Sequence, residues 1–457
     1  MELKNKRILV FGTGKSGLAA AELLLSRGAV PVLYDGNDTL DTETIRSKIR
    51  HADAAHTEVI LGELPDDVIR TMDLVVMSPG VPCDLPVMDR IRSQGVPVWG
   101  EIELAYRCGK GRVYAITGTN GKTTSTTLLG QILSDAFPEV YVVGNIGNPY
   151  TEAVNGQTEN AITAAEISSF QLETIDRFHP NASAITNITP DHLNRHHTME
   201  EYIRVKRRIF ENQTMDDLCV LNYEDEILRT MPAPSHTRVR WFSSRRTLEE
   251  GLYVRDGGIY LRENGAETLI LRTDELHIMG LHNYENVMTA VGIALDAGVP
   301  LESIRRTLRA FRGVEHRIEY VTEIRQVRYY NDSKGTNPDA AIKGIQAMDR
   351  PTLLIGGGYD KESEYDEWIR SFDGKVKLLA LIGQTSEKIR TAAIACGFPE
   401  KQIVCCENLE QAVKICAENA AAGDAVLLSP ACASWGQFDN YEQRGDLFKQ
   451  YVHALEE

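Results

Sequence analysis

The 457-residue sequence lacks an excess of positive charge and any long apolar run. Its formal net charge is −16, whereas nucleic-acid-binding proteins usually carry a basic surface, so we expect no nucleic-acid partner. No apolar run reaches the length of a membrane span, and the first apolar stretch, residues 8–11, is too short for a signal peptide. These absences predict a cytoplasmic protein that does not bind membranes.

The sequence also lacks paired cysteines. Eight cysteines are present, but none forms the Cys-x-x-Cys pairs typical of zinc sites. Cys405 and Cys406 are adjacent, which is a poor arrangement for a disulfide framework in a chain of this length. We therefore expect buried free thiols in a reducing compartment.

Apolar residues make up 42% of the chain and charged residues 25%, which is ordinary for a globular protein. Domains of about 100–200 residues suggest about three domains here. Three successive segments alternate strand-like and helical stretches, which is typical of α/β domains with mainly parallel sheets. We place the domains at residues 1–101, 102–313 and 314–457. A polar, β-prone stretch near residues 240–280 indicates an insertion or an extra small sheet.

A glycine-rich loop lies between a strand-like and a helical stretch in the second segment. Its residues are Gly118, Thr119, Asn120, Gly121, Lys122, Thr123 and Thr124. This context favours a phosphate-binding loop, because backbone N–H groups and a helix N-terminus bind anions. Lys122 would reach the β- and γ-phosphates of a nucleotide, and the Thr123 hydroxyl would bind Mg²⁺. The first glycine of the usual motif is absent, so the match is to a shorter variant; the alternative is a glycine-rich turn with a stray lysine.

Two polar residues follow predicted strands in the same segment. Glu166 ends one strand and His192 follows the next. Because ligand sites of parallel sheets form at the carboxyl ends of strands, we expect Thr123, Glu166 and His192 to share one magnesium site. The alternative for His192 is a solvated loop residue. For Lys206, spacing alone indicates only an exposed basic helix face.

A second glycine motif lies near the N-terminus and is followed by Asp35. Its residues are Gly12, Thr13, Gly14, Lys15, Ser16 and Gly17. A strand, this loop, a helix and an acid about 20 residues further on resemble a dinucleotide-binding fingerprint, which by itself would suggest NAD. Such a motif is weak alone, because the fold binds many phosphate groups.

Further motifs lie along nearly the whole chain after the phosphate loop. They are Gly144-Asn145-Ile146-Gly147, Glu166-Ile167-Ser168-Ser169-Phe170-Gln171-Leu172-Glu173, Asp191-His192-Leu193, Gly280-Leu281-His282-Asn283-Tyr284-Glu285-Asn286, His316-Arg317, Asn331-Asp332-Ser333-Lys334-Gly335-Thr336-Asn337 and Leu428-Ser429-Pro430-Ala431-Cys432-Ala433-Ser434. Together with the phosphate loop, these motifs resemble those of the Mur ligase family of peptidoglycan precursor synthesis. The last two are most similar to the family member that adds D-glutamate to UDP-N-acetylmuramoyl-L-alanine.

The resemblance implies an α/β protein with a Rossmann-like N-terminal domain, a central P-loop ATPase-type domain and a Rossmann-like C-terminal domain. It also implies an ATP-dependent ligase that forms an amide through an acyl phosphate, uses two Mg²⁺ ions and is a monomer. The implied partners are small molecules, namely ATP, UDP-N-acetylmuramoyl-L-alanine and D-glutamate.

The resemblance also implies a role for particular residues. The catalytic set is Lys122, Asn145, Glu166, His192 and Lys206. The metal ligands are Thr123, Glu166, His192 and Lys206, the last as a carbamate. Beyond the phosphate loop, the ATP contacts are Asn283, Asn286, Arg317 and Asp332. The UDP-substrate contacts are Gly14, Lys15, Ser16, Asp35 and Gly80. The D-glutamate contacts are Lys334, Thr336, Lys361, Ser434 and Tyr441.

Three other interpretations stay open at this point. A nicotinamide-dependent dehydrogenase would use the N-terminal glycine motif, but this interpretation gives the phosphate loop no function. Another ligase of the family, including folylpolyglutamate synthetase or the diaminopimelate- or lysine-adding enzyme, would carry different N- or C-terminal motifs. A nucleotide-gated regulatory protein would use the phosphate loop as a switch.

Overall fold

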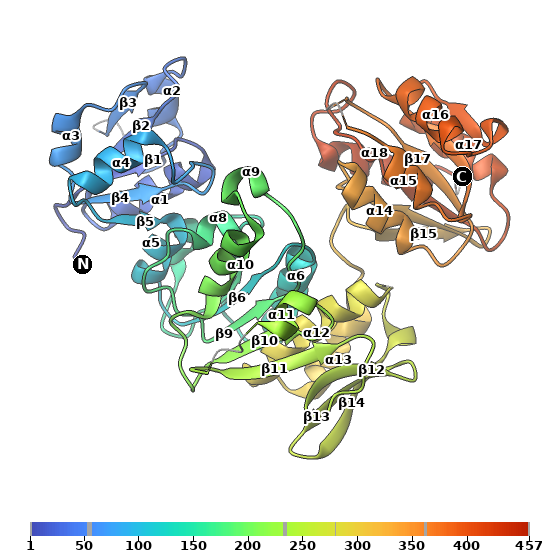
Figure 1. The fold of residues 1–457 in the computed structure, drawn as a ribbon, viewed down its shortest axis with the longest axis horizontal. Coiled ribbons are helices and arrows are strands. Elements are labelled where there is room, and N and C mark those ends of the chain that lie inside the picture. Colours follow the sequence, from blue (N-terminus) through green and yellow to red (C-terminus); the bar gives the residue numbers. More distant parts are fainter. Residues whose placement is uncertain (1, 53–56, 232–234, 279, 361–362, 456–457) are drawn as a thin grey trace. The chain divides into compact units, whose positions relative to one another are not determined.

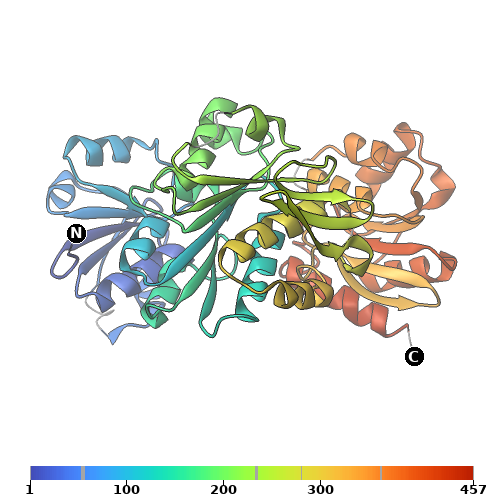
Figure 2. The same ribbon diagram turned by 90° about the horizontal axis from the view of Figure 1, so that it is seen from below.

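The computed structural model describes residues 2–52, 57–231, 235–278, 280–360 and 363–455 (Figures 1 and 2). They form three sheets in two compact units. The first unit contains Met1–Glu275 and Leu281–Arg309, and the second contains Leu276–Gly280 and Ala310–Glu457. Among the residues described, no helix combines the length and hydropathy that a bilayer crossing requires.

The N-terminal sheet has five parallel strands in the order β3-β2-β1-β4-β5. Its strands are β1 (Arg7–Phe11), β2 (Val30–Asp35), β3 (Glu58–Leu61), β4 (Leu74–Met77) and β5 (Val98–Gly100). The connecting helices are α1 (Lys15–Ser26), α2 (Thr42–Ser47), α3 (Asp66–Arg70) and α4 (Pro86–Ser93). Leu9 and Val10, which point to opposite faces of the sheet, are both fully buried, as expected of a parallel sheet covered on both faces.

The central sheet has nine strands in the order β14-β13-β12-β11-β10-β9-β6-β8-β7. Its strands are β6 (Arg112–Thr117), β7 (Val140–Gly144), β8 (Ile162–Glu166), β9 (Ala182–Ile185), β10 (Leu218–Asn222), β11 (Arg238–Ser243), β12 (Gly251–Arg255), β13 (Gly258–Glu263) and β14 (Ala266–Arg272). The helices of this region are α5 (Glu101–Cys108), α6 (Lys122–Ser134), α7 (Tyr150–Ala153), α8 (Ser169–Leu172), α9 (Leu193–His196), α10 (Met199–Arg207), α11 (Glu226–Thr230), α12 (Leu281–Asp296) and α13 (Leu301–Ala310).

The β-prone stretch near residues 240–280 does not form a separate sheet. β11 pairs in parallel with β10, and β12 pairs in parallel with β11, so the stretch extends the central sheet. β13 and β14 then add two antiparallel strands at its edge. The sequence indicated strands here but not their pairing, because strand pairing is a long-range property.

The C-terminal sheet has six strands in the order β15-β16-β20-β17-β18-β19. All its pairings are parallel except the hairpin of β15 and β16. Its strands are β15 (Glu319–Ile324), β16 (Val327–Asn331), β17 (Thr352–Gly356), β18 (Val376–Leu381), β19 (Ile403–Cys405) and β20 (Ala425–Leu428). Its helices are α14 (Pro338–Gln346), α15 (Asp366–Arg370), α16 (Ser386–Ala395), α17 (Leu409–Asn419) and α18 (Tyr441–His453).

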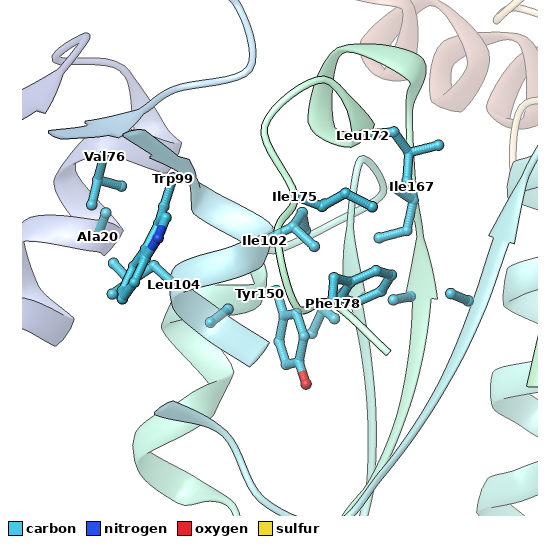
Figure 3. Packing of buried hydrophobic residues seen from close by; sticks show 14 of the residues in the cluster. Ala20, Val76, Trp99, Ile102, Leu104, Tyr150, Ile167, Leu172, Ile175 and Phe178 are labelled. Carbon is cyan, nitrogen blue, oxygen red and sulfur yellow. The ribbon is translucent and has the colours of Figure 1, made fainter. Parts of the chain in front are cut away.

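One apolar cluster joins the N-terminal and central sheets within the first unit (Figure 3). Trp99 of β5 belongs to the same cluster as Val76 of the first sheet, Ile102 of α5 and Tyr150 of α7. The Arg107 guanidinium stacks on Trp99 at 4.1 Å from the ring centroid. This continuous packing explains why the two sheets form a single compact unit.

Two buried glutamates of α5 have opposite surroundings. The Glu103 carboxylate accepts backbone N–H bonds from Asp176, Arg177 and Phe178, at 2.8–3.0 Å, and a bond from Arg107 Nε at 2.5 Å. Oε1 of Glu101 accepts two bonds from Thr151, whereas its Oε2 is buried without a partner. Burial raises the pKa of Glu101.

We expect Glu103→Gln to lower the free energy of unfolding by about 3 kcal/mol, because an amide cannot accept all of these bonds and turns an N–H group toward other N–H groups. Glu101→Gln is the matched control and should change it by less than about 1 kcal/mol, since the amide oxygen can keep both Thr151 bonds. Urea unfolding of both variants measures the difference. Equal losses would contradict the contrast between the two sites.

Candidate active site

The phosphate loop connects the end of β6 to the start of α6. Gly118 and Gly121 both have positive φ, +146° and +84°. A Cβ on Gly118 would lie 1.9 Å from Thr186 Oγ1, and one on Gly121 would lie 2.2 Å from Asn286 Oδ1. These two positions therefore require glycine both for backbone conformation and for space.

The loop is held by residues that follow β9. Asn187 Oδ1 accepts from the Asn120 N–H at 2.9 Å, and its Nδ2 donates to the Asn120 carbonyl at 3.1 Å. Thr186 Oγ1 donates to the same carbonyl at 2.6 Å. The loop shape is thus fixed without any ligand.

Two lysines converge on one carbonyl of this loop. Lys122 Nζ donates to the carbonyls of Gly118 and Thr119, each at 2.9 Å, and Lys206 Nζ donates to the Gly118 carbonyl at 2.8 Å. Lys206 is 1% exposed, and its ammonium lies 4.7 Å from the centroid of the Tyr202 ring. Burial first, and then the charge of Lys122, holds the pKa of Lys206 well below its usual value, with Asp191 opposing the shift.

The buried position of Lys206 has a sequence explanation. α10 places Tyr202 and Val205 in the core, and Ile209, in the short turn that follows α10, is also buried; Lys206 lies four residues after Tyr202 and three before Ile209. These spacings put Lys206 on the apolar face of the helix. The exposed basic face indicated by local spacing is therefore wrong.

Glu166 ends β8, which lies beside β6, and Ile116 of β6 is directly opposite Glu166. Its side chain is 1% exposed. Oε1 accepts from Asn145 Nδ2 at 2.7 Å, whereas Oε2 is buried without a hydrogen-bond partner. The Asn145 N–H also donates to the Glu166 carbonyl at 2.8 Å, so the loop after β7 is attached to Glu166 at two points.

His192 lies in the loop after β9, seven residues beyond the strand end, rather than directly after it. It caps the N-terminus of α9 in the left-handed conformation, with φ of +52°. Its side chain is 49% exposed, its Nε2 lies 3.5 Å from Asp191 Oδ2, and its ring contacts Phe170 edge-on at 4.8 Å between centroids. The ring is thus accessible to a ligand and held on one side.

The residues predicted to bind magnesium fit that ion chemically. Thr123 offers a hydroxyl and Glu166 a carboxylate, which are the oxygen ligands that Mg²⁺ prefers, and His192 offers one imidazole nitrogen. The partnerless Oε2 of Glu166 is an acceptor that a cation would satisfy.

A different cluster of possible metal ligands lies in the C-terminal unit. It consists of Glu315, His316 and Asp446, whose ligand atoms lie within 4.8 Å of one another. Lys449 Nζ is 2.5 Å from Glu315 and 3.2 Å from Asp446. Because an ammonium group already neutralises these carboxylates, we do not consider this cluster a metal site.

Asn283 and Asn286 lie on α12 and meet the phosphate loop. Asn286 Nδ2 donates to Asn283 Oδ1 at 3.1 Å, and Ser125 of α6 donates to Asn286 Oδ1 at 3.4 Å. Asn286 also fills the space beside Gly121. The structure therefore places Asn286 beside the loop and Asn283 against Asn286, while Arg317 and Asp332 belong to the second compact unit.

The N-terminal glycine motif lies where the strand order of the first sheet reverses, between β1 and β4. Gly12 follows β1, and a Cβ there would lie 2.8 Å from Oγ of Ser78, which follows β4. Gly14, Lys15 and Gly80 are exposed, and Ser16 is half-buried. Such a reversal is where parallel sheets bind ligands.

Asp35 fastens this glycine loop. Its Oδ2 accepts from the N–H of Thr13 at 3.1 Å and from its hydroxyl at 2.8 Å, and Oδ1 accepts from the Asn37 N–H at 3.1 Å. Lys15 Nζ donates to the Gly147 carbonyl at 3.0 Å and to Asn148 Oδ1 at 3.1 Å. The loop therefore contacts the segment that carries Asn145.

In the C-terminal unit, polar residues gather where β16 and β20 end. Ser429 Oγ donates to Asp332 Oδ2 at 2.6 Å. Arg444 is fully buried and joins the two loops by donating to Ser333 Oγ at 3.0 Å, to the Ser333 carbonyl at 2.8 Å and to the Cys432 carbonyl at 3.2 Å. Burial lowers the pKa of Arg444 to about 10.

The predicted D-glutamate residues belong to the same unit. The Lys334 ammonium lies 5.6 Å from the Tyr441 ring centroid, and Arg317 interacts electrostatically with both Asp332 and Tyr441. Ser434 is buried and Thr336 is half-buried. Lys361 lies outside the residues that the structure describes.

Several residues that contact the site were not predicted from the sequence. Thr186, Asn187 and Tyr202 hold the phosphate loop, and Tyr202 does so through a 3.1 Å hydrogen bond between its hydroxyl and Thr119 Oγ1. Glu173 follows the predicted metal ligand Glu166 by seven residues, Arg195 follows His192 by three, and the two pair with each other. The position of Thr186 and Asn187 just after a central strand was the available clue.

Family models match almost the entire chain. The Mur ligase MurD-like N-terminal domain matches residues 6–100, the Mur ligase middle domain matches residues 116–294, and the Mur ligase glutamate ligase domain matches residues 316–432. This chain therefore belongs to the Mur ligase family, and it is an ATP-dependent ligase of peptidoglycan synthesis that forms an amide bond.

Curated relatives cover the whole chain. The UDP-N-acetylmuramoylalanine–D-glutamate ligase of Lachnoclostridium phytofermentans is 54% identical over 457 residues, and that of Clostridioides difficile is 43% identical over 456 residues, with 100% of each chain covered. Among solved structures, UDP-N-acetylmuramate-alanine ligase MurC of Thermotoga maritima has a TM-score of 0.57 at 19% identity, covering 98% of this chain and 100% of its own. MurF ligase of Thermotoga maritima, in complex with ADP, has a TM-score of 0.56 at 15% identity, covering 99% and 96%. The likeness to these two solved structures shows that this chain shares their α/β fold. The sequence predicted this fold class, with three domains.

The titration of Asp332 gives a test of the C-terminal site. Burial raises the pKa of Asp332 to about 7 from the ordinary 3.8, although the Ser429 hydrogen bond lowers it. Between these two values the folded protein keeps a proton that the unfolded chain has released, so the free energy of unfolding falls as pH rises through this window.

We expect the free energy of unfolding of Asp332→Asn, relative to the native chain, to increase by about 2 kcal/mol between pH 5 and pH 8, because the variant has no carboxyl to ionise. Denaturant unfolding at both pH values measures the change. Asp373→Asn, at an exposed carboxyl, is the control and should follow the native chain. A pH-independent difference for Asp332→Asn would show that the buried carboxyl does not titrate in this range.

Proposed function

We propose that this chain joins D-glutamate to UDP-N-acetylmuramoyl-L-alanine, consuming ATP. The observation that carries the proposal is the meeting of two lysines, Lys122 and Lys206, on the Gly118 carbonyl of the phosphate loop. The Lys122 cation at a helix N-terminus suits a crowded polyphosphate, and Lys206 beside it has a lowered pKa. The names of the relatives and the matching C-terminal family model support D-glutamate as the amino acid.

Activation of the carboxylate is the first step. A carboxylate is a poor electrophile, so its oxygen attacks the γ-phosphorus of ATP, the bond to the β-phosphate oxygen breaks, and an acyl phosphate and ADP form. Lys122 would neutralise the charge that moves from the γ- to the β-phosphate. We propose that Asn145 lies near the reacting carboxylate. The hydrogen bond from Asn145 to Glu166 would keep the Asn145 side chain in place.

Amide formation follows. The uncharged amine of D-glutamate attacks the acyl carbon, the bond to the phosphate oxygen breaks, and inorganic phosphate leaves. The amine loses a proton in this step. We propose that the C-terminal residues Lys334, Thr336, Lys361, Ser434 and Tyr441 bind the amino acid, and that the cation of Lys334 receives one of its carboxylates.

Two Mg²⁺ ions would screen the phosphate oxygens when bound. We propose that Thr123, Glu166 and His192 hold them, together with Lys206 as a carbamate. The lowered pKa of Lys206 supports this proposal, because only a neutral amine attacks carbon dioxide. The carbamate would give the buried Lys206 side chain a negative charge, suited to a cation.

The remaining assignments are also proposals. We place ATP on residues 118–124 with Asn283, Asn286, Arg317 and Asp332. We place the UDP substrate on Gly14, Lys15, Ser16, Asp35 and Gly80, supported by the strand reversal beside that loop. We propose domains at residues 1–101, 102–313 and 314–457, a monomer, and a cytoplasmic location, which the eight free cysteines support.

We expect phosphate release from ATP only when both UDP-N-acetylmuramoyl-L-alanine and D-glutamate are present, because each step needs its own acceptor. A phosphate-release assay with a panel of D-glutamate, L-glutamate, diaminopimelate, lysine and no amino acid measures this. D-glutamate should exceed every other amino acid by at least about 100-fold, since a site that pairs buried charges discriminates strongly. Equal turnover with another amino acid would contradict the assignment of D-glutamate as the substrate.

We expect Lys206→Ala to lose at least about tenfold in kcat, the size of effect typical for partners of a metal site, and to regain activity with added acetate or formate. A short carboxylate would occupy the space of the carbamate. Lys122→Met is the control. It should also lose activity, but added carboxylate should not rescue it, because this variant lacks an ammonium group and not a carboxylate. Lys206→Ala that stays inactive at saturating carboxylate would contradict the carbamate.

A further inference from the structure

Two short helices follow the two side chains that we propose as metal ligands. α8 starts three residues after Glu166, and α9 starts directly after His192. His192 is joined to α9 through its carbonyl, which accepts from the N–H groups of Arg195 and His196 at 2.9 and 3.0 Å. Any contact between α8 and the α9 segment therefore connects the segment that carries Glu166 to the one that carries His192.

A buried ion pair makes such a connection. Arg195 donates two parallel bonds to Glu173, which directly follows α8: Nε to Oε1 at 3.1 Å and Nη2 to Oε2 at 2.6 Å. The two side chains are only 11% and 12% exposed. A two-bond arginine–carboxylate pair fixes direction as well as distance, which a lysine cannot do.

An aromatic ring makes the second connection. Phe170 of α8 lies under the Arg195 guanidinium, 4.6 Å from its carbon to the ring centroid. The same ring contacts His192 edge-on at 4.8 Å and His196 at 5.7 Å between centroids. Arg195 thus holds the ring that supports one face of His192.

His196 adds a third connection between the helices. Its Nε2 lies 2.9 Å from Ser169 Oγ, and its Nδ1 lies 3.5 Å from Glu173 Oε1. Its ring lies 5.2 Å from that of Tyr202, whose hydroxyl contacts Thr119 of the phosphate loop. The cluster therefore continues to the nucleotide side of the site.

We propose that Arg195, acting through Glu173 and Phe170, is a positioning residue that sets the spacing of Glu166 and His192. This inference rests on the proposed role of those two residues as metal ligands. Nη2 of Arg195 also donates to the Val81 carbonyl at 2.9 Å, in the loop after β4 that borders the proposed UDP site. Arg195 therefore connects the side chains that orient the proposed metal ligands to the loop after β4 of the first sheet.

The test is the affinity of the full-length protein for Mn²⁺ alone, measured by electron paramagnetic resonance without nucleotide. We expect Arg195→Met to raise the Mn²⁺ dissociation constant about tenfold, as losses of partners that orient metal ligands do. Arg195→Lys should also weaken binding, because the two-bond geometry is lost while the charge remains. Phe170→Leu keeps the apolar volume but removes the ring edge, and should weaken Mn²⁺ binding as well.

Arg240→Met is the matched control. Arg240 is 12% exposed, makes one bond to Glu263 at 2.8 Å and donates to the Gly292 carbonyl at 2.8 Å, so like Arg195 it is a largely buried arginine that bonds to a carboxylate and a carbonyl of the same unit. Its loss should lower the midpoint of thermal unfolding, as the loss of Arg195 should, but leave Mn²⁺ affinity within twofold of the native chain. A similar loss of Mn²⁺ affinity in Arg240→Met would mean that general destabilisation explains the effect, and would overturn the proposal.

Glu166→Gln separates the two proposals. If it weakens Mn²⁺ binding while folded Arg195→Met and Phe170→Leu bind like the native chain, the positioning role is wrong and the metal site stands. If Glu166→Gln binds Mn²⁺ as tightly as the native chain, the metal assignment is wrong and the positioning role falls with it. Should Arg195→Met not fold, Phe170→Leu alone decides between the first two outcomes.

Discussion

The carbonyl of Gly118 is the acceptor on which the phosphate loop depends. Lys122 reaches it from the helix that begins at the loop, and Lys206 reaches it from a helix 88 residues away in sequence. Two ammonium groups on one acceptor repel each other, and burial of Lys206 adds to the cost of its charge. Lys206 is therefore shifted toward its neutral form, and the Lys122 cation at the start of α6 is the charge that favours an anion at the same place.

The surroundings of that loop are built from strand ends. Glu166 lies opposite Ile116 in the parallel register of β8 and β6, and Thr186 and Asn187 follow β9 on the other side. Because these strands are neighbours, the residues after them must meet at one edge of the sheet. The short helices after Glu166 and His192 are then held to each other by Arg195 and Glu173 rather than by strand pairing.

The two sheets of the first unit share one apolar core, so the N-terminal glycine loop and the phosphate loop belong to one packed body. α5 makes this connection, and its Glu103 is surrounded by N–H donors of the segment before β9. Glu101 is equally buried, but its second oxygen has no hydrogen-bond partner. The two carboxylates therefore differ in the number of hydrogen-bond donors around them and not in their burial.

The sequence alone determined the local parts of this protein: the glycine-rich loop between strand and helix, the α/β alternation and the family motifs that identify a Mur ligase. These follow from short-range chemistry, since glycine conformation, helix periodicity and anion binding depend on residues close in the chain. Only the tertiary structure decided that Lys206 is buried against the loop, that residues 240–280 extend the central sheet and that Arg195 pairs with Glu173. Each of these depends on packing between elements distant in sequence: spacing within α10 puts Lys206 on an apolar helix face, but only the packed structure shows that this face meets the phosphate loop.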